Sequence, residues 1–355
     1  MEAVADGAGG GELLVDKHVA FVKSLDKNQN DLEYWMSEHL RVSGVYWGLV
    51  ALSLVGRSNA LDSAEVVAYV LSCQNADGGF GGHTGHDSHL LYTMSAVQIL
   101  VMCDALDRVD ADRIIEYVVR LQNAETGAVS GDEWGEEDTR FAFIAVATLS
   151  FFGAQSRLDI PGVVRYVERS MNYDGGFGSG PGGESHAAQV YTCLACLAIT
   201  GRLDLVNRDR LSAWLAERQL PCGGLNGRPQ KLEDVCYSWW ALSSLHILGR
   251  PHWIHRPRLI EFILSAQDPA GGIADRPGNI ADVYHTCFGI AGLSLAGFDR
   301  TALAEIDPVY CMPRAVVERA GLRGWTERVP AAWRGADNSY SVLRKTLRGT
   351  DEEIA

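Results

Sequence analysis

The sequence has few basic residues for its length and contains no long apolar run. Lys and Arg number 31 against 45 Asp and Glu, so the 355 residues carry a formal net charge of −14 with His neutral. An acidic surface repels nucleic acid and anionic membranes. The longest nearly apolar stretch, residues 141–154, contains Thr148, Ser150 and Gly153 and is shorter than the roughly 20 residues of a membrane span. We therefore expect neither a nucleic-acid partner nor a transmembrane segment.

Two further absences concern the start of the chain and the cysteines. Residues 1–12 are acidic and rich in Ala and Gly, and they lack the basic and apolar regions of a secretory signal. Most of the eight cysteines lie inside apolar helical stretches rather than in loops at the spacing of a disulfide framework. We therefore expect a cytoplasmic protein with reduced thiols, most of them in the core. Residues 1–12 are predicted to form a flexible N-terminal segment.

Glycine is abundant instead, with 38 residues, and its spacing reveals a repeat. Gly153, Gly201, Gly249 and Gly297 each close an apolar stretch and lie 48 residues apart. Glycine-rich segments such as 74–82 (Gln-Asn-Ala-Asp-Gly-Gly-Phe-Gly-Gly) recur at nearly the same period, beginning at residues 74, 122, 171, 219 and 267. A fixed period of this size is typical of repeat architectures and predicts one domain, although length alone would suggest two or three.

Each repeat is predicted to hold two helices joined by a glycine-rich turn. The first, as in 63–73 and 256–265, has apolar residues at helical spacing, and the second is apolar or small nearly all round, which predicts burial. Six such second helices end near residues 56, 103, 153, 201, 249 and 297. We predict an all-α fold in which about six helical hairpins close into an α/α toroid over residues 13–313. An open solenoid is the alternative. Residues 314–355 break the period and are expected to be a charged tail of unknown role.

Ionisable residues concentrate where the inner helices begin. Counting back fifteen residues from the closing glycines gives Asp138, His186, Asp234 and Asp282. An Asp at such a position commonly serves as an N-cap. Cys236 follows Asp234 by two residues, and His285 lies one repeat later, on what would be the neighbouring helix. Carboxylate, thiolate and imidazole with a fourth position open are typical of a catalytic zinc site. The structural alternative is a capping Asp, a core Cys and a buried His.

A cationic group is predicted at the same end of the barrel. Arg228 and Lys231 lie among glycines just before the candidate zinc helix, and together with His186 and Tyr237 they could bind a diphosphate. The alternative is a solvated surface loop. Aromatic residues follow on consecutive inner helices, and they would suit an apolar, cation-forming substrate in an open funnel or would simply fill the core. These aromatic residues are Tyr191, Tyr237, Trp239, Trp240, Tyr284 and Phe288.

The repeats and several segments resemble protein prenyltransferase β subunits. The segments that carry this resemblance are 234–240 (Asp-Val-Cys-Tyr-Ser-Trp-Trp) and 282–289 (Asp-Val-Tyr-His-Thr-Cys-Phe-Gly). Within that family, segments 85–93, 134–141, 223–231 and 307–313 are most similar to Rab geranylgeranyltransferase (type II) β subunits. The resemblance implies a prenyltransferase and terpenoid cyclase-like toroid. It also implies an enzyme that moves geranylgeranyl from its diphosphate to C-terminal cysteines of Rab GTPases, together with an α subunit and a Rab escort protein.

The same resemblance implies roles for individual residues. Asp234, Cys236 and His285 would be zinc ligands. The diphosphate-binding, catalytic positions would be His186, Arg228, Lys231 and Tyr237. Trp240 and Arg140 would line the site, Ser43 would leave depth for a geranylgeranyl chain, and Asp275 matches a carboxylate linked to magnesium in farnesyltransferases. The charged segment from Arg314 onward departs from the family's usual short ending.

Rival interpretations differ in what they require. A farnesyltransferase or type I geranylgeranyltransferase β subunit would prefer another lipid or acceptor. A terpene cyclase needs an acidic Asp-x-Asp-Asp motif, and the nearest cluster is 136–138 (Glu-Glu-Asp). A toroid glycosidase would use carboxylates such as Asp132, Glu136 or Asp138 and no zinc. A non-catalytic scaffold would have no reason to bring Asp, Cys and His together.

Overall fold

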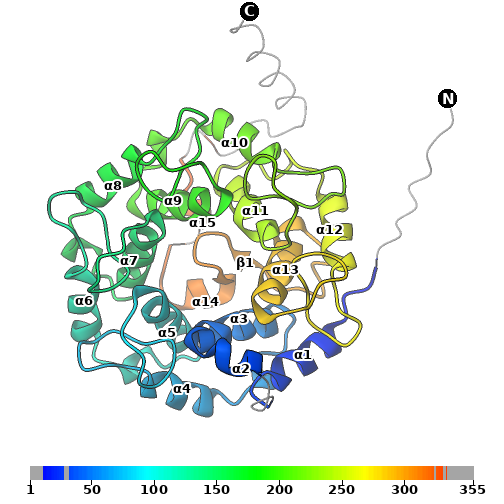
Figure 1. Ribbon diagram of the computed structural model, residues 1–355, viewed down its shortest axis with the longest axis horizontal. Helices are drawn as coiled ribbons and strands as arrows, with labels where there is room; N and C mark the ends of the chain where they lie inside the picture. The colour runs from blue at the N-terminus through cyan, green and yellow to red at the C-terminus, as the bar shows by residue number, and fades with distance from the viewer. Residues whose placement is uncertain (1–10, 28–31, 324, 331–332, 334–355) are drawn as a thin grey trace, which may run out of the picture.

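Six helices form a closed inner ring, each packed on the next, with α13 returning to α3 (Figure 1). The computed structural model describes residues 11–27, 32–323, 325–330 and 333. The inner helices are α3 (Arg41–Leu54), α5 (Leu90–Met102), α7 (Thr139–Phe151), α9 (Ala187–Thr200), α11 (Tyr237–Ile247) and α13 (Val283–Ala296). Contact between α13 and α3 confirms the predicted toroid of six hairpins, and an open solenoid is wrong.

A second set of helices covers the inner ring from outside. These outer helices are α1 (Val15–Ser24), α4 (Ser63–Ser72), α6 (Ala111–Val119), α8 (Ile160–Arg169), α10 (Arg208–Ala216) and α12 (Arg256–Ser265). They are amphipathic: α8 buries Val163, Val164 and Val167 while its charged residues face solvent. Short helices complete the connections, namely α2 (Leu32–Met36), η1 (Glu38–Leu40), η2 (Ser58–Ala60), η3 (Leu106–Arg108), η4 (Gln155–Arg157) and η5 (Leu203–Leu205).

The inner helices end as the repeat predicts. Gly153, Gly201, Gly249 and Gly297 all have positive φ, the backbone conformation that a left-handed helix stop requires and glycine adopts at low cost. The first full repeat has Asp104 in this role, with φ 56°. A short polar side chain is the usual substitute for glycine there, which explains why the glycine count misses one helix end.

Glutamine side chains join neighbouring repeats on the outside. Gln219 donates to the carbonyl of His255 at 3.0 Å and accepts from its N–H at 2.7 Å. Gln122 makes the same pair of bonds with Asp159. Gln267 accepts from the N–H of Leu14 at 2.9 Å, so the last repeat is tied to the first and the ring is closed by hydrogen bonds as well as packing.

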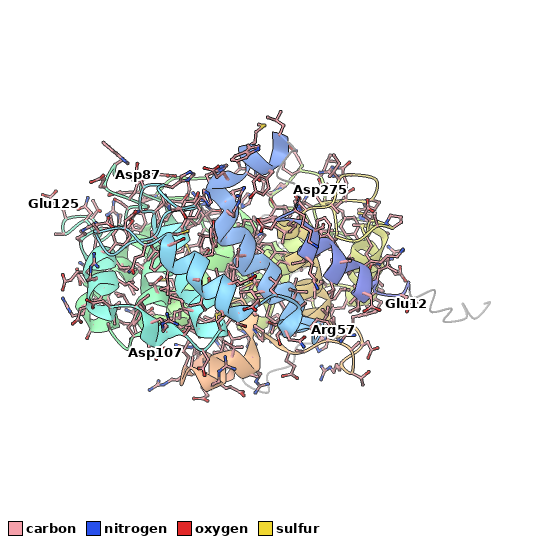
Figure 2. The ribbon with its side chains drawn as sticks, turned by 90° about the horizontal axis from the view of Figure 1, so that it is seen from below. Glu12, Arg57, Asp87, Asp107, Glu125 and Asp275 are labelled. Atoms are coloured by element: carbon pink, nitrogen blue, oxygen red, sulfur yellow. The ribbon has the colours of Figure 1, made fainter. Side chains whose placement is uncertain are left out.

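The glycine-rich turns and the C-termini of the inner helices lie at opposite ends of the barrel (Figure 2). Asp87, Glu125 and Asp275, which belong to turns, lie on one side, and Arg57 and Asp107, which follow inner helices, lie on the other. We call the end with the turns the mouth. No helix of the described residues is long and apolar enough to cross a membrane.

The end opposite the mouth is closed by a hairpin that we call the floor hairpin, residues 306–313. Its strands β1 (Ile306–Asp307) and β2 (Met312–Pro313) pair antiparallel. The chain then forms α14 (Arg314–Arg319) and α15 (Trp325–Arg328). The predicted tail of 314–355 is thus partly helical in its described residues, and its remainder from residue 334 lies outside them, as do residues 1–10 of the predicted N-terminal segment.

All eight cysteines are free thiols. Six of them are buried, in line with the expected core positions, whereas Cys103 is partly buried and Cys222 is exposed.

Candidate functional site

The inner helices begin at the mouth, and the polar residue expected at each start is there. Asp138 accepts from the N–H of Arg140 at 2.8 Å, and His186 accepts through Nδ1 from Ala188 at 3.2 Å, as N-caps do. Asp234 was predicted to open a helix in the same way, and that prediction is wrong by two residues because the N-cap of α11 is Cys236 and the helix begins at Tyr237. The N–H groups of Tyr237, Ser238 and Trp239 each bond to the carbonyl three residues back, so the chain makes a tight turn before the regular helix begins.

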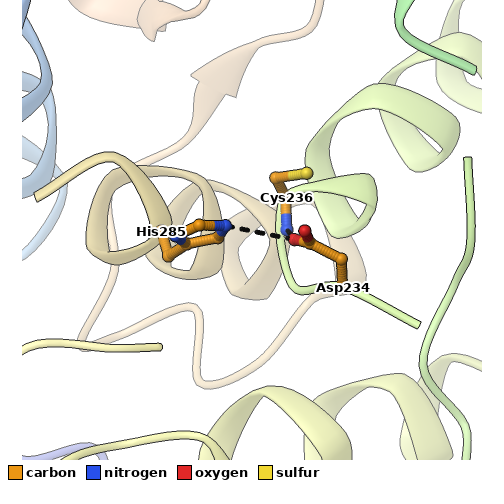
Figure 3. A group of neighbouring side chains, drawn as sticks. All are labelled: Asp234, Cys236 and His285. Carbon is orange, nitrogen blue, oxygen red and sulfur yellow. Dashed lines mark hydrogen bonds and ion pairs between the residues drawn. The ribbon is translucent and has the colours of Figure 1, made fainter. Parts of the chain in front are cut away.

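Asp234, Cys236 and His285 lie together at the mouth (Figure 3). One ligand atom from each, a carboxylate oxygen, the thiol sulfur and an imidazole nitrogen, lies within 4.8 Å of the others. The Nε2 atom of His285 is 3.2 Å from Oδ1 of Asp234, and Cys236 is buried. Among the described residues, this is the one group of His, Cys, Asp or Glu spaced to hold a metal ion.

Hydrogen bonds set the charge of this group. Burial alone would lower the pKa of His285, but its bonds to Asp234 and Asp282 outweigh burial and raise that pKa to about 9. Burial likewise opposes ionisation of Asp234, yet bonds from His285 and Cys236 hold its pKa below the usual value. Burial, followed by the Asp234 carboxylate, raises the pKa of Cys236. Without a metal the group is therefore a carboxylate, an imidazolium and a thiol.

The arrangement fits a zinc ion. The donors are one oxygen, one sulfur and one nitrogen, the set that zinc accepts, and three protein ligands leave a fourth position for another molecule. Nδ1 of His285 is 2.6 Å from Oδ2 of Asp282, so its other nitrogen faces the group. A second carboxylate on the far side of a ligating histidine is the usual way to fix that ring. The chain thus presents a candidate zinc site, with Asp282 as its outer support.

A pocket of about 510 Å³ adjoins the candidate zinc site. Its lining includes all four residues predicted to bind a diphosphate, and Asp234 is shared with the candidate metal group. The lining residues are His186, Gly227, Arg228, Gln230, Lys231, Leu232, Asp234, Tyr237 and Arg276. The guanidinium of Arg228 pairs with Glu184 at its edge. Positive charge is therefore gathered in one pocket of an otherwise acidic protein.

His186 and Tyr237 meet inside this pocket. Nε2 of His186 is 3.2 Å from the hydroxyl of Tyr237. Nδ1 of His186 accepts from a backbone N–H, so a neutral ring carries its proton on Nε2, toward the pocket. Burial and then Arg228 lower the pKa of His186, and burial raises that of Tyr237, so both are neutral donors near pH 7. A Cβ at Gly227 would come within 2.4 Å of the Tyr237 hydroxyl, so only glycine allows this close approach.

Arg276 is a pocket residue that the sequence interpretation missed. It lies 48 residues after Arg228, so it occupies the same place in the following turn. Its Nε is 3.0 Å from Oδ2 of Asp275. The repeat spacing that located the other residues could have found it.

The lining of this pocket does not include Arg140, Ser43 or Trp240. Arg140 pairs with Asp138 at 3.0 Å, and the hydroxyl of Ser43 is 3.1 Å from that of Ser95. Trp240 donates to the hydroxyl of Tyr284 and packs its ring on Phe288 with centroids 4.7 Å apart.

Asp275 does not join the candidate metal group. Its carboxylate is occupied by Arg276 and by Asn279, which donates at 2.8 Å. Binding of magnesium there stays a prediction, as do the lipid and diphosphate roles.

Comparison with known proteins identifies relatives of this chain. Residues 13–312 match the family described as the prenyltransferase alpha-alpha toroid domain. The chain is 49% identical over 314 residues to the geranylgeranyl transferase type-2 subunit beta of Saccharomyces cerevisiae, an alignment that covers 86% of this chain and 96% of that one. It is 33% identical over 203 residues to the protein farnesyltransferase subunit beta of Schizosaccharomyces pombe, covering 55% and 52% of the two chains.

A solved structure supports the fold. The chain resembles a protein geranylgeranyltransferase-I from Candida albicans, determined in complex with GGPP, with a TM-score of 0.79 over 90% of this chain and 100% of that one. Their sequences are 19% identical, so the likeness concerns the toroid itself.

Proposed function

Because the chain belongs to the prenyltransferase toroid family as a geranylgeranyl transferase type-2 β subunit, we propose that it transfers a geranylgeranyl group from geranylgeranyl diphosphate to C-terminal cysteines of Rab GTPases. The product is a thioether. The convergence of Asp234, Cys236 and His285 beside a cationic pocket is the observation that carries the proposal.

Asp234, Cys236 and His285 would hold zinc, with Asp282 orienting His285. When bound, zinc would supply the Lewis acidity that keeps a substrate thiol in its nucleophilic thiolate form near neutral pH. The acceptor sulfur then forms a bond to C1 of the prenyl chain while the bond from C1 to the diphosphate oxygen breaks. The diphosphate leaves with that electron pair, and the thiol proton goes to solvent.

The pocket residues would stabilise the leaving diphosphate. Arg228, Lys231 and Arg276 supply positive charge where negative charge grows on the bridging oxygen, and neutral His186 and Tyr237 supply N–H and O–H donors. Diphosphate is a good leaving group once it is neutralised in this way, so the mechanism needs no additional acid–base pair.

The inner helices would hold the lipid. Rings of Tyr191, Trp240, Tyr284 and Phe288 contact one another below the mouth, and their faces can stabilise partial allylic cation character at C1. Ser43 presents a small side chain beside Ser95, which would leave depth for a C20 chain.

The proposed function also includes partners. We expect a heterodimer with a prenyltransferase α subunit in the cytoplasm, with the Rab presented by an escort protein, and magnesium near Asp275 remains part of the proposal. The net charge of −14 would repel nucleic acid, so we expect no nucleic-acid partner.

The decisive test is a transfer assay with the purified αβ heterodimer. Zinc content is measured first, and thioether formation is then followed with farnesyl and geranylgeranyl diphosphate, a Rab and its escort protein. We expect one zinc per β subunit and preference for geranylgeranyl diphosphate. Preference for farnesyl diphosphate would refute the lipid assignment, and transfer by a zinc-free enzyme would refute the metal assignment.

A further inference from the structure

The floor hairpin is held by polar side chains of three inner helices. Tyr46 of α3 donates to the carbonyl of Cys311 at 2.7 Å, Gln98 of α5 donates to that of Tyr310 at 2.9 Å, and Tyr191 of α9 donates to that of Val309 at 2.7 Å. Gln98 also donates to the hydroxyl of Tyr46 at 3.2 Å, so the side chains that hold the hairpin are linked to one another. The hairpin therefore sits at a defined height inside the ring.

The hairpin is also rigid in itself. Asp307 is fully buried, and its carboxylate accepts from the N–H groups of Val309 and Tyr310 at 2.9 and 3.0 Å. The hydroxyl of Tyr310 is 3.0 Å from that of Ser150 and accepts from Arg328 at 3.0 Å. The hairpin is therefore held both by bonds within itself and by bonds to Ser150 and Arg328, so a ligand in contact with it would not easily displace it.

The hairpin lies close, along the inner helices, to the serines proposed to line the lipid. Ser43 and Ser95 lie nearer the mouth, and the hairpin-binding residues Tyr46 and Gln98 follow three residues later on the same helices. Three residues of helix advance about 4.5 Å. A chain that passes the two serines thus meets the hairpin within about one helical turn.

Cys311 is the hairpin residue whose thiol lies against side chains of the inner helices. It retains 7% exposure, whereas Tyr310 and Met312 retain none. Its thiol is a neighbour of the Tyr46 hydroxyl and of the Cys287 thiol, both on inner helices. Burial, followed by the Cys311 and Cys287 thiols, raises the pKa of Tyr46. Cys311 also has φ 54°, a left-handed backbone conformation that glycine adopts more easily than other residues.

We propose that the floor hairpin is the bottom of the lipid funnel and that the Cys311 side chain limits the length of prenyl chain the enzyme accepts. This inference rests on the proposed function. Ser43 would decide whether a chain can pass its level, and Cys311 would decide where the chain must end.

The size of the residue at 311 should then shift lipid preference in both directions. A pocket discriminates one methylene by about 10-fold or more. Cys311→Met lengthens the side chain without branching, so it would raise the floor and penalise C20 more than C15. Cys311→Gly removes the thiol at a positive φ that glycine tolerates, so it would deepen the funnel and favour C25.

The test measures kcat/KM of the αβ heterodimer for farnesyl (C15), geranylgeranyl (C20) and geranylfarnesyl (C25) diphosphates. We expect the C20 to C15 ratio to fall at least 10-fold in Cys311→Met and the C25 to C20 ratio to rise at least 10-fold in Cys311→Gly. Cys196→Ala, which removes another buried thiol from an inner helix, should change neither ratio.

The outcomes separate this inference from the proposed function. Unchanged ratios in active variants would overturn the role of Cys311, as would equal losses with all three lipids. Thermal unfolding of each variant identifies a folding defect, and if Cys311→Met does not fold, Cys311→Gly decides. A wild-type heterodimer that transfers no C20 group would instead overturn the proposed function.

Discussion

The segments that lead into helices α7 and α11 are equivalent in the repeat, yet one forms an ion pair and the other a candidate metal site. Asp138, Arg140 and Gln189 occupy the positions that Asp234, Cys236 and His285 occupy two repeats later. At α7 the carboxylate pairs with Arg140 at 3.0 Å and accepts weakly from Gln189 at 3.4 Å. At α11 it meets an imidazole beside a thiol. The same three positions thus recur in different repeats of the toroid, and at one of them the side chains are spaced to hold a metal ion.

The backbone conformation at these aspartates does not by itself make a metal site. Both aspartates accept from the N–H two residues on, at 2.8 and 2.7 Å, so both do the same local structural work. Two side chains decide the rest. A permanent cation at 140 neutralises Asp138, whereas a neutral thiol at 236 leaves the carboxylate available to a metal.

The largest expected effect comes from removing the thiol. Cys236→Ala should lose zinc and lower transfer by more than about 100-fold, since even outer-shell changes at metal sites cost 10–100-fold. Arg140→Ala at the equivalent place should keep full zinc content. Metal analysis and transfer assays on both heterodimers check this, and equal zinc loss in the two variants would break the contrast.

A second metal site should form when residues 140 and 189 are replaced by the residue types found at the equivalent positions 236 and 285. The double variant Arg140→Cys, Gln189→His places Asp, Cys and His at 138, 140 and 189, so we expect it to bind a second zinc equivalent. His186 stands where Asp282 supports His285, so the new site should bind about 10–100-fold more weakly than the original. Zinc titration of the double and single variants measures this. One equivalent in the double variant would mean that helix placement differs between the repeats.

The smallest effect concerns protons released on zinc binding. Metal ligands must be deprotonated, and His285 with a pKa of about 9 and Cys236 with a raised pKa both carry protons at pH 7. Zinc binding at pH 7 should therefore release about two protons, and apparent affinity should rise with pH up to about 9 as the imidazolium is lost.

Asp282→Asn tests whether one of the two released protons comes from His285. Asparagine still caps the helix but removes a charged partner of His285, so its pKa falls and at pH 8 release should approach one proton. Calorimetric titration in two buffers of different ionisation enthalpy counts the protons, with Asp138→Asn as the matched control. Two protons in Asp282→Asn at pH 8 would show that Asp234 alone raises the pKa of His285.

The sequence predicted much of the site because the repeat is regular. The pairing of Asp234 and Cys236 with His285 follows from one period of 48 residues and from neighbouring helices in a ring. The start of α11 was misplaced because the segment after Asp234 first forms a tight turn, with successive bonds to the third residue back, that the capping pattern does not reveal. Arg276 was missed although it lies one period after Arg228, since a lone arginine in a turn has no local signature.

Sequence by itself determined the period, the helix ends and the residue types at the mouth. It could do so because each repeat folds through contacts with its neighbours, and glycine stops and apolar spacing are local properties. Only the tertiary structure decided that residues 306–313 enter the ring and bond to Tyr46, Gln98 and Tyr191. Those partners are up to 265 residues apart and the hairpin has no period, so nothing local could reveal which polar groups it would satisfy.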